Sequence, residues 1–390
     1  MVKTSYATFT FILIVFQNQK LMNICIYSSY AWIKIANNYG SILQYFALQT
    51  YLEKQGHQVY WLRFKPKEKV TLKYKIANLL LKRKDRNRTY KHQNPKDFQE
   101  FENKYLHETP YEYTSYSQLK NNPPKADAYI TGSDQVWAGL SAERYLAFAP
   151  KGTKTLSYAA SFGSPKQGFL NKILFTWRLK NIDYISVREK VGIDYCKTFG
   201  RNDAVYVCDP SLLLEKTDYE KFINNKKNIK KPYIFSYWVN PIQSLEHISW
   251  TKITNYANKA KLDIVITAIQ GAEFSFNKEK IISPNPLEWL QLIHDAQYVI
   301  TSSFHGVAFS IVMKVPFLII PQKGNSSAEN LRFYDLLDNL GLTERIYDHS
   351  KPIDLQLEKS INWNEVESKI NVLKEVSFNF LKKSLTKQWL

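Results

Sequence analysis

Short apolar runs alternate with amphipathic stretches along most of the chain. Residues 23–30 (NICIYSSY) form an apolar run that is typical of a buried strand. Residues 42–52 then carry apolar side chains at helical spacing, and Gly56 follows where such a helix is expected to end. Residues 57–64 (HQVYWLRF) form the next strand-like run. The pattern predicts a βαβ unit, and therefore a parallel sheet.

The same alternation continues to about residue 321. Further strands are predicted at 128–131, 184–187, 204–208, 233–239, 262–271, 296–303 and 315–321. A polar stretch rich in Lys and Asn interrupts the pattern at 216–231, and we interpret it as a linker. We expect an α/β protein with two Rossmann-like domains, at 22–215 and 232–390, whose parallel sheets face a cleft.

Residues 1–21 precede the first predicted strand. Within them, residues 7–16 (ATFTFILIVF) are apolar but too few to span a bilayer. We expect residues 1–21 to be an extension outside the fold, and a signal segment or membrane anchor is the alternative.

The chain is strongly basic, with 53 Lys and Arg against 35 Asp and Glu and a formal net charge of +18. Such a surplus favours anionic partners. It is densest at 65–91, where eleven basic residues stand against two acidic ones. This segment is a candidate for contact with an anionic membrane surface, and a solvated basic helix is the alternative. Because no recognised motif accompanies the charge, we expect no nucleic-acid partner.

The three cysteines, Cys25, Cys196 and Cys208, are widely separated. Their spacing matches neither a metal site nor a disulfide framework. We therefore expect no metal and no cofactor, and a reducing compartment. The predicted location is cytoplasmic, with peripheral attachment at the inner face of the cell membrane as a variant of it.

Polar residues follow the predicted strands, at the edge where parallel α/β sheets bind ligands. They include Asn38, Gly40, Ser133, Asp134, Gln135, Trp137, Arg188, Ser302, Ser303, His305 and Gly306. Most have a structural interpretation as well. Asn38 can cap a helix, Asp134 can form a turn, and Arg188 with Glu189 can be a surface pair. Asp209–Pro210 is better interpreted as a structural turn.

His305 differs from these residues because it lies between an apolar strand and an apolar helix, in the small polar sequence Ser-Ser-Phe-His-Gly. A buried structural histidine is the alternative to a functional one.

Several stretches together resemble a known family. They are NNYGSILQYFALQTYLEKQGHQV, YITGSDQVW, YAASFG, ISVREKVG, CDPSLLL and WLQLIHDAQYVITSSFHGVAFSIVMKVPFLIIP, and they span about 37–320. In their order and spacing the chain resembles the polysaccharide pyruvyl transferases, whose members look like two-domain, GT-B-like proteins. Many members carry an Arg two residues before the histidine that matches His305. Ser303 stands there in this chain, which resembles a Ser-Phe-His-Gly subgroup.

The resemblance implies transfer of a pyruvyl group from phosphoenolpyruvate to sugar hydroxyls of a cell-surface polysaccharide or its precursor, forming a ketal. The implied partners are phosphoenolpyruvate and a glycan or lipid-linked sugar acceptor, with the acceptor on the N-terminal domain and the donor on the C-terminal one. Two alternatives stay open. One is a GT-B glycosyltransferase that uses a nucleotide sugar, and the other is a non-catalytic glycan- or membrane-binding protein.

Ketal formation needs an acid for the enol carbon, a base for the hydroxyl, and cations for the carboxylate and phosphate. His305 is the expected acid or base because an ordinary imidazole titrates at about pH 6.5. Asp134 is the second catalytic candidate, as a base. Donor and phosphate binding is expected from Ser302, Ser303, Gly306, Arg188, Lys323 and Arg332. Acceptor binding is expected from Asn38, Gly40, Ser133, Gln135 and Trp137.

Overall fold

The computed structural model describes residues 21–28, 38–66, 95–163, 169–223, 229 and 231–386. Apart from Leu21, the predicted extension at 1–21 lies outside these residues, and so does all of the basic segment 65–91 beyond Pro66. The predictions made for these two segments therefore stay predictions.

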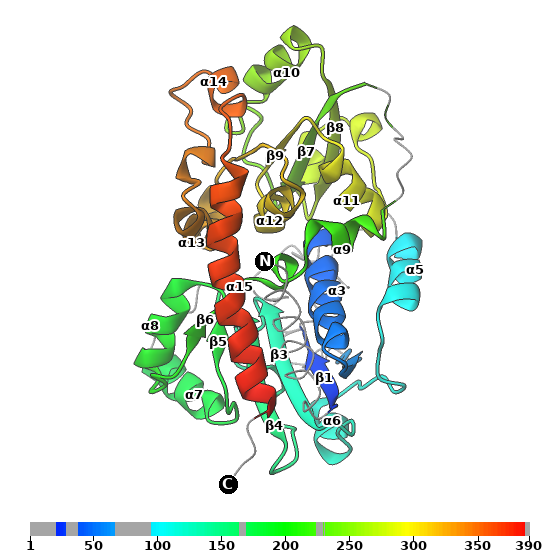
Figure 1. Ribbon diagram of the computed structural model, residues 1–390, viewed down its shortest axis with the longest axis vertical. Helices are drawn as coiled ribbons and strands as arrows, with labels where there is room; N and C mark the ends of the chain where they lie inside the picture. Colours follow the sequence, from blue (N-terminus) through cyan, green and yellow to red (C-terminus); the bar gives the residue numbers. More distant parts are fainter. Residues whose placement is uncertain are drawn as a thin grey trace, which may run out of the picture.

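The strands of the described chain form two separate sheets, one in each half of the molecule (Figure 1). The first has the order β2-β1-β3-β4-β5-β6 and the second β10-β9-β7-β8, and neighbouring strands are parallel throughout. The strands are β1 (Asn23–Tyr27), β2 (Gln58–Trp61), β3 (Ala128–Asp134), β4 (Lys154–Ala160), β5 (Ser186–Val187), β6 (Val205–Tyr206), β7 (Tyr233–Val239), β8 (Asp263–Ile269), β9 (Tyr298–Thr301) and β10 (Phe317–Ile319). The predicted α/β class with two parallel sheets is confirmed.

The sequence pattern missed one strand, β4. It carries polar residues where a buried strand usually carries Val or Ile, so no apolar run marks it. Ser157 is fully buried, and its Oγ donates to the carbonyl of Ser186 at 3.0 Å. Thr155 Oγ1 likewise donates to the carbonyl of Asn181 at 2.8 Å. These hydrogen bonds satisfy the buried hydroxyls, which is why the strand tolerates them.

Helices pack against the sheets and between the two halves (Figure 1). They are α3 (Tyr39–Lys54), α5 (Pro95–Tyr105), α6 (Tyr116–Asn121), α7 (Phe169–Leu179), α8 (Lys190–Thr198), α9 (Lys216–Glu220), α10 (Trp250–Lys259), α11 (Pro286–His294), α12 (Phe304–Met313), α13 (Leu331–Leu340), α14 (Ile353–Leu357) and α15 (Trp363–Thr386). None of these described helices is both long and apolar enough to cross a membrane.

Helix α3 brings the two halves into direct contact. It begins after Asn38, whose Oδ1 accepts a hydrogen bond from the N–H of Ser41 at 3.1 Å, as expected of an N-cap. Its first residue, Tyr39, stacks on Trp289 of α11 with ring centroids 5.5 Å apart. The Tyr39 hydroxyl donates to the carbonyl of Pro284 at 2.9 Å. One continuous apolar core therefore includes residues from both halves.

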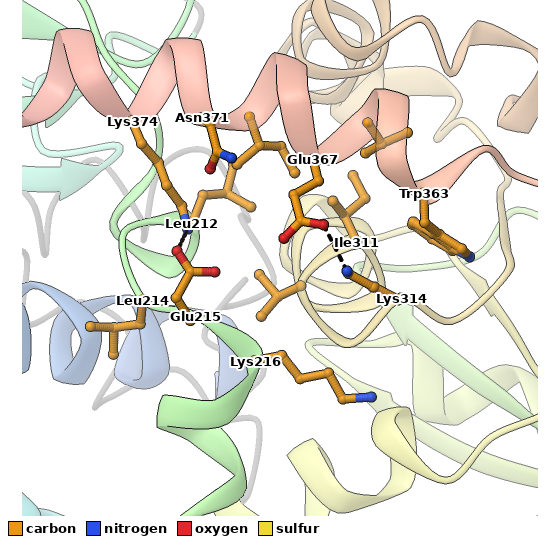
Figure 2. A pocket seen from close by; sticks show the side chains of 13 residues that line it. Leu212, Leu214, Glu215, Lys216, Ile311, Lys314, Trp363, Glu367, Asn371 and Lys374 are labelled. Atoms are coloured by element: carbon orange, nitrogen blue, oxygen red, sulfur yellow. Dashed lines mark hydrogen bonds and ion pairs between the residues drawn. The ribbon is translucent and has the colours of Figure 1, made fainter. Parts of the chain in front are cut away.

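Helix α15 runs along both halves of the molecule (Figure 1). Lys374 pairs with Glu215 of the first half, and Glu367 pairs with Lys314 of the second half at 2.9 Å (Figure 2). Further along the helix, Ser377 Oγ accepts a hydrogen bond from the N–H of Cys208 at 3.0 Å. The last helix thus contacts residues of both halves of the molecule. The predicted domain boundary at 216–231 stays a prediction.

Candidate active site

The two sheets meet at the edges where ligands are expected. Strand order reverses between β1 and β3 in the first sheet and between β7 and β9 in the second. Parallel α/β sheets bind ligands at such reversals, beyond the carboxyl ends of the strands. Here the start of α3 lies against the start of α12. A Cβ built on Gly40 would lie 2.2 Å from Cγ of His305, so only glycine fits there without displacing the imidazole.

Arg188 lies at the centre of a buried ion-pair network. Its guanidinium nitrogens contact Asp209 Oδ2 at 2.7 Å, Asp134 Oδ1 at 3.0 Å and Glu189 Oε1 at 3.3 Å. The side chain is only 2% exposed. Burial alone would lower the pKa of Arg188, but the three carboxylates outweigh burial and raise the pKa above its ordinary value. Arg188 is therefore a permanent cation that holds three acidic side chains together.

Asp134 connects the first half to the second. Besides Arg188, it is contacted by Ser41 Oγ at 3.1 Å and by Arg332 Nη1 of α13 at 3.4 Å. Burial tends to raise the pKa of Asp134, but Arg188, His305 and Arg332 together hold it well below its usual range. Asp134 is therefore ionised at neutral pH, and it is a weak proton acceptor for that reason.

His305 occupies the joint between the two halves, with 5% of its surface exposed. Its Nε2 lies 3.8 Å from Asp209 Oδ2, which is too long for a hydrogen bond, and it has no hydrogen-bond partner in the described part of the chain. Burial lowers the pKa of His305, and the nearby Asp209 and Asp134 offset this only in part. The ring is therefore neutral at pH 7, and its buried Nε2 is available to a ligand.

The loop before α12 is fixed by its own hydrogen bonds. Ser302 Oγ accepts from the N–H of Val239 at 3.1 Å, and Ser303 caps α12 by accepting from the N–H of Gly306 at 3.4 Å. A Cβ on Gly306 would lie 2.5 Å from Thr301 Oγ1. Both serines and the glycine therefore shape the start of the helix, where backbone N–H groups favour an anion.

Other predicted residues lie near this cluster. Ser133 Oγ contacts Asp209 Oδ2 at 3.4 Å, and Gln135 is half-buried beside Gly163. Asn38 acts on the backbone of α3, as its cap. These three residues and Gly40 are placed at the carboxyl edge of the first sheet, where an acceptor role stays a prediction.

Two predicted residues lie elsewhere. Trp137 is fully buried in the core of the first half, where it stacks on Tyr145 and its Nε1–H donates to the carbonyl of Arg144 at 3.2 Å. Its indole therefore offers no surface to an acceptor. Lys323 is exposed, and its charge acts on another group: burial and then Lys323 lower the pKa of His247. Lys323 lines a small pocket that includes Ser302 and His247, but among the described residues it makes no ion pair with the carboxylates around Arg188.

Three functional candidates were undervalued or missed by the sequence analysis. Asp209 forms the expected turn, since its Oδ1 accepts from the N–H of Ser211 at 3.0 Å, but its Oδ2 also binds Arg188. Glu189 is buried instead of being part of a surface pair, and burial raises its pKa. Ser41 follows Gly40 and reaches Asp134. The available signal was the position of Asp209 and Glu189 directly after predicted strands.

The described residues contain no group of three or more His, Cys, Asp or Glu side chains that could hold a metal ion.

Solved structures similar to this one support the fold. The UDP-GlcNAc 2-epimerase of Methanocaldococcus jannaschii is 14% identical with a TM-score of 0.50, and the match covers 92% of this chain and 100% of the epimerase. A Listeria monocytogenes protein assigned to the UDP-N-acetylglucosamine 2-epimerases is 7% identical with a TM-score of 0.53, covering 93% and 96%. At these identities the likeness concerns the fold, which is of the GT-B type.

No curated protein matches the chain by sequence. The family model for polysaccharide pyruvyl transferase matches residues 38–324. This range contains Gly40, Asp134, Arg188 and His305, and thus most of the cluster described above. The chain belongs to the polysaccharide pyruvyl transferase family and is a transferase.

Proposed function

We propose that this protein transfers a pyruvyl group from phosphoenolpyruvate to two hydroxyls of a sugar, forming a cyclic ketal on a cell-surface polysaccharide or its precursor. The observation that carries the proposal is His305: a neutral, buried imidazole whose Nε2 has no partner in the described chain. It lies at the joint of the two sheet edges, beside ionised Asp209 and Asp134.

The reaction requires one proton to be added and two to be removed. Protonation of C3 of phosphoenolpyruvate makes C2 cation-like, and a first sugar hydroxyl adds to C2 as it loses its proton. The C2–O bond to phosphate then breaks, and a second hydroxyl adds at C2 and loses its proton. Phosphate leaves with the bridging oxygen and takes up one proton, so the proton added at C3 and the proton on phosphate balance the two lost by the hydroxyls. A single group that can both give and take a proton suits this sequence.

Binding of the donor would change the protonation of His305. The free ring is neutral because burial disfavours its charged form. A carboxylate and a phosphate placed beside it favour the imidazolium, so a proton taken up with the donor becomes available for C3. The carboxylates of Asp209 and Asp134 act in the same direction, which makes them positioning and electrostatic residues for His305.

The donor's negative charge needs cations that are not already saturated. Arg188 has all three guanidinium nitrogens on carboxylates, so its part is to hold Asp209, Asp134 and Glu189 in place. Arg332 also has partners, since its Nη2 pairs with Glu329 Oε2 at 2.6 Å and its Nε donates to the Glu329 carbonyl at 3.2 Å. It is still the better clamp, because its Nη1 makes only a long contact of 3.4 Å with Asp134 and its side chain is 12% exposed against 2% for Arg188. The first turn of α12, capped by Ser303, supplies backbone N–H groups for the phosphate.

Donor binding tests this assignment directly. The melting temperature is measured with phosphoenolpyruvate, with inorganic phosphate and with UDP-GlcNAc. We expect phosphoenolpyruvate to stabilise the folded protein by about 3 kcal/mol at a hundredfold excess over its dissociation constant. Arg332→Gln should lose this stabilisation, whereas Lys323→Gln should keep it. Stabilisation by UDP-GlcNAc alone would contradict the donor assignment and favour a nucleotide sugar.

A further inference from the structure

Helix α7 presents its apolar stripe to solvent, against the usual pattern. Leu170, Ile173, Leu174 and Trp177 are spaced as one helical face, and they are 73%, 51%, 43% and 56% exposed. The opposite face is packed normally, with Phe175 and Leu179 buried in the core of the first half. Single exposed apolar residues are common, but four contiguous large ones mark an interaction surface.

Basic residues accompany this stripe. Arg178 lies on α7, and Lys180 directly follows its last residue. The Arg178 guanidinium carbon lies 4.6 Å from the centre of the Trp177 ring, and its Nε donates to the carbonyl of Leu140 at 2.9 Å. Residues 144–182 contain no Asp or Glu and seven Lys or Arg, namely Arg144, Lys151, Lys154, Lys166, Lys172, Arg178 and Lys180. The nearest acidic residues in sequence are Glu143 and Asp183, at the two borders of this range. An exposed apolar face with Trp, accompanied on its own segment by Lys172, Arg178 and Lys180, is complementary to a bilayer that carries anionic headgroups.

We propose that α7 docks on an anionic lipid bilayer, with Leu170, Ile173, Leu174 and Trp177 inserted at the headgroup level and Arg178 and Lys180 among the headgroups. This surface is distinct from the basic segment 65–91, which lies almost wholly outside the described residues. The proposal does not depend on which donor the enzyme uses.

Docking through α7 has a consequence for the active site. Gly163 follows β4 by three residues and lies beside Gln135 at the carboxyl edge of the first sheet. Six residues of chain later, α7 begins, so its start lies within about 20 Å of Gly163. A bilayer on α7 therefore lies within reach of the sheet edge assigned to the acceptor, which suits an acceptor sugar that is linked to a lipid.

Vesicle flotation tests the docking surface. The wild-type chain, Ile173→Ser/Trp177→Ser and a matched control, Val372→Ser/Val376→Ser, are compared on phosphatidylcholine vesicles with and without phosphatidylglycerol. The control removes two apolar side chains that are 64% and 40% exposed on α15. We expect the α7 variant to lose roughly 100-fold in partitioning to anionic vesicles, with the control unchanged. Lys180→Gln should lose about fivefold at low salt.

A site-specific label gives an independent measurement. The three cysteines are free and buried, so a spin label on Ile173→Cys reports on α7, and one on Val372→Cys reports on α15. With anionic vesicles the label at 173 should become accessible to dissolved oxygen and protected from a water-soluble relaxant, while the label at 372 should not.

Three results would overturn the proposal. The first is flotation of the α7 double variant equal to that of the wild type. The second is equal binding of the wild type to neutral vesicles. The third is a dimer in sedimentation equilibrium that Ile173→Ser/Trp177→Ser converts to monomer with no change in vesicle binding, which would assign the face to a second copy of this chain. Unchanged melting temperatures establish that each variant is folded.

Discussion

The two sheet edges that meet at the candidate site differ in chemistry. The first sheet supplies charged groups: Asp134 ends β3, Arg188 and Glu189 follow β5, and Asp209 follows β6. These four side chains form one ion-pair network. The second supplies the neutral residues Ser302 and Ser303 and the first turn of α12, which carries the imidazole of His305. The first edge therefore holds the charged side chains in place, and the second edge places the titratable ring of His305 beside them. Neither edge alone has both, so the site exists only where the halves meet.

The largest effect on stability is expected from removing Arg188, the central cation of the charged edge. Arg188→Leu leaves three carboxylates in a buried network without their common cation, which costs about 3–5 kcal/mol of the free energy of unfolding. Lys190→Gln is the matched control, because Lys190 pairs with Asp338 at 3.3 Å with both side chains at least half exposed. It should cost less than about 1 kcal/mol. Urea unfolding measures both, and equal losses would show that the Arg188 network is not the stabilising element.

The neutral edge should respond in the opposite way. His305→Gln removes titration but no hydrogen bond of Nε2 to the described residues. We expect turnover to fall about 10²–10⁴-fold, the range for a lost general acid or base, with little change in melting temperature. Steady-state kinetics and calorimetry on the same preparation separate the two readouts. Near-normal turnover with a clearly lower melting temperature would make His305 a structural residue.

These two effects also show how far the sequence alone could lead. The alternation of apolar runs placed β7 at its observed bounds. It put Asp134 and His305 in loops after strands, whereas Asp134 is the last residue of β3 and His305 lies in the first turn of α12. It could not tell which of those loops would be buried against each other. Asp209 looked like an ordinary turn and Glu189 like half of a surface pair, because burial by segments far along the chain leaves no local signal. For the same reason Trp137, which follows the polar sequence Ser133–Gln135 by two residues, proved to be a core residue.

The close contact between Gly40 of the first edge and His305 of the second can be disrupted by adding one carbon atom. Gly40→Ala places a Cβ 2.2 Å from Cγ of His305, so the imidazole or α3 must shift. Because a misplacement of about 1 Å is enough to cost about 10²-fold in rate, we expect a loss of that size. Gly139→Ala is the control: its Cβ would meet Arg144 Nε at an ordinary 3.5 Å. Normal turnover in Gly40→Ala would mean that the close contact is not part of the working site.

A smaller difference between the two edges is expected in the pH dependence of the free energy of unfolding. The pKa of His305 is lowered on folding, so below about pH 6.5 the unfolded chain binds a proton that the folded chain does not. Stability is therefore lost as pH falls from 7 to 5, by up to about 1.4 kcal/mol per pH unit.

His305→Gln should lack this loss. Asp134 and Asp209, which face the ring, have lowered pKa values and stay ionised over this range. Arg188, whose pKa is raised, stays charged as well, and Arg332 also faces the ring. Other histidines and Glu189 are present in both proteins, so their contributions cancel in the difference. Parallel stability curves for wild type and variant between pH 7 and 5 would contradict a neutral, buried His305.

The smallest effect on turnover and on KM is expected from Lys323→Gln, because Lys323 of the second half makes no ion pair with the described charged residues of the first half. Arg332 contacts Asp134 across the joint, whereas Lys323 is exposed and acts on His247. Lys323→Gln should therefore change turnover and KM for phosphoenolpyruvate by no more than about twofold, as an ordinary surface substitution does. Arg332→Gln should raise that KM at least tenfold, because a charge-assisted contact to the donor is lost. If Lys323→Gln raised this KM more than Arg332→Gln did, the donor's anionic group would have to lie near Lys323. The carboxyl edge of the second sheet would then bind the donor without residues of the first sheet.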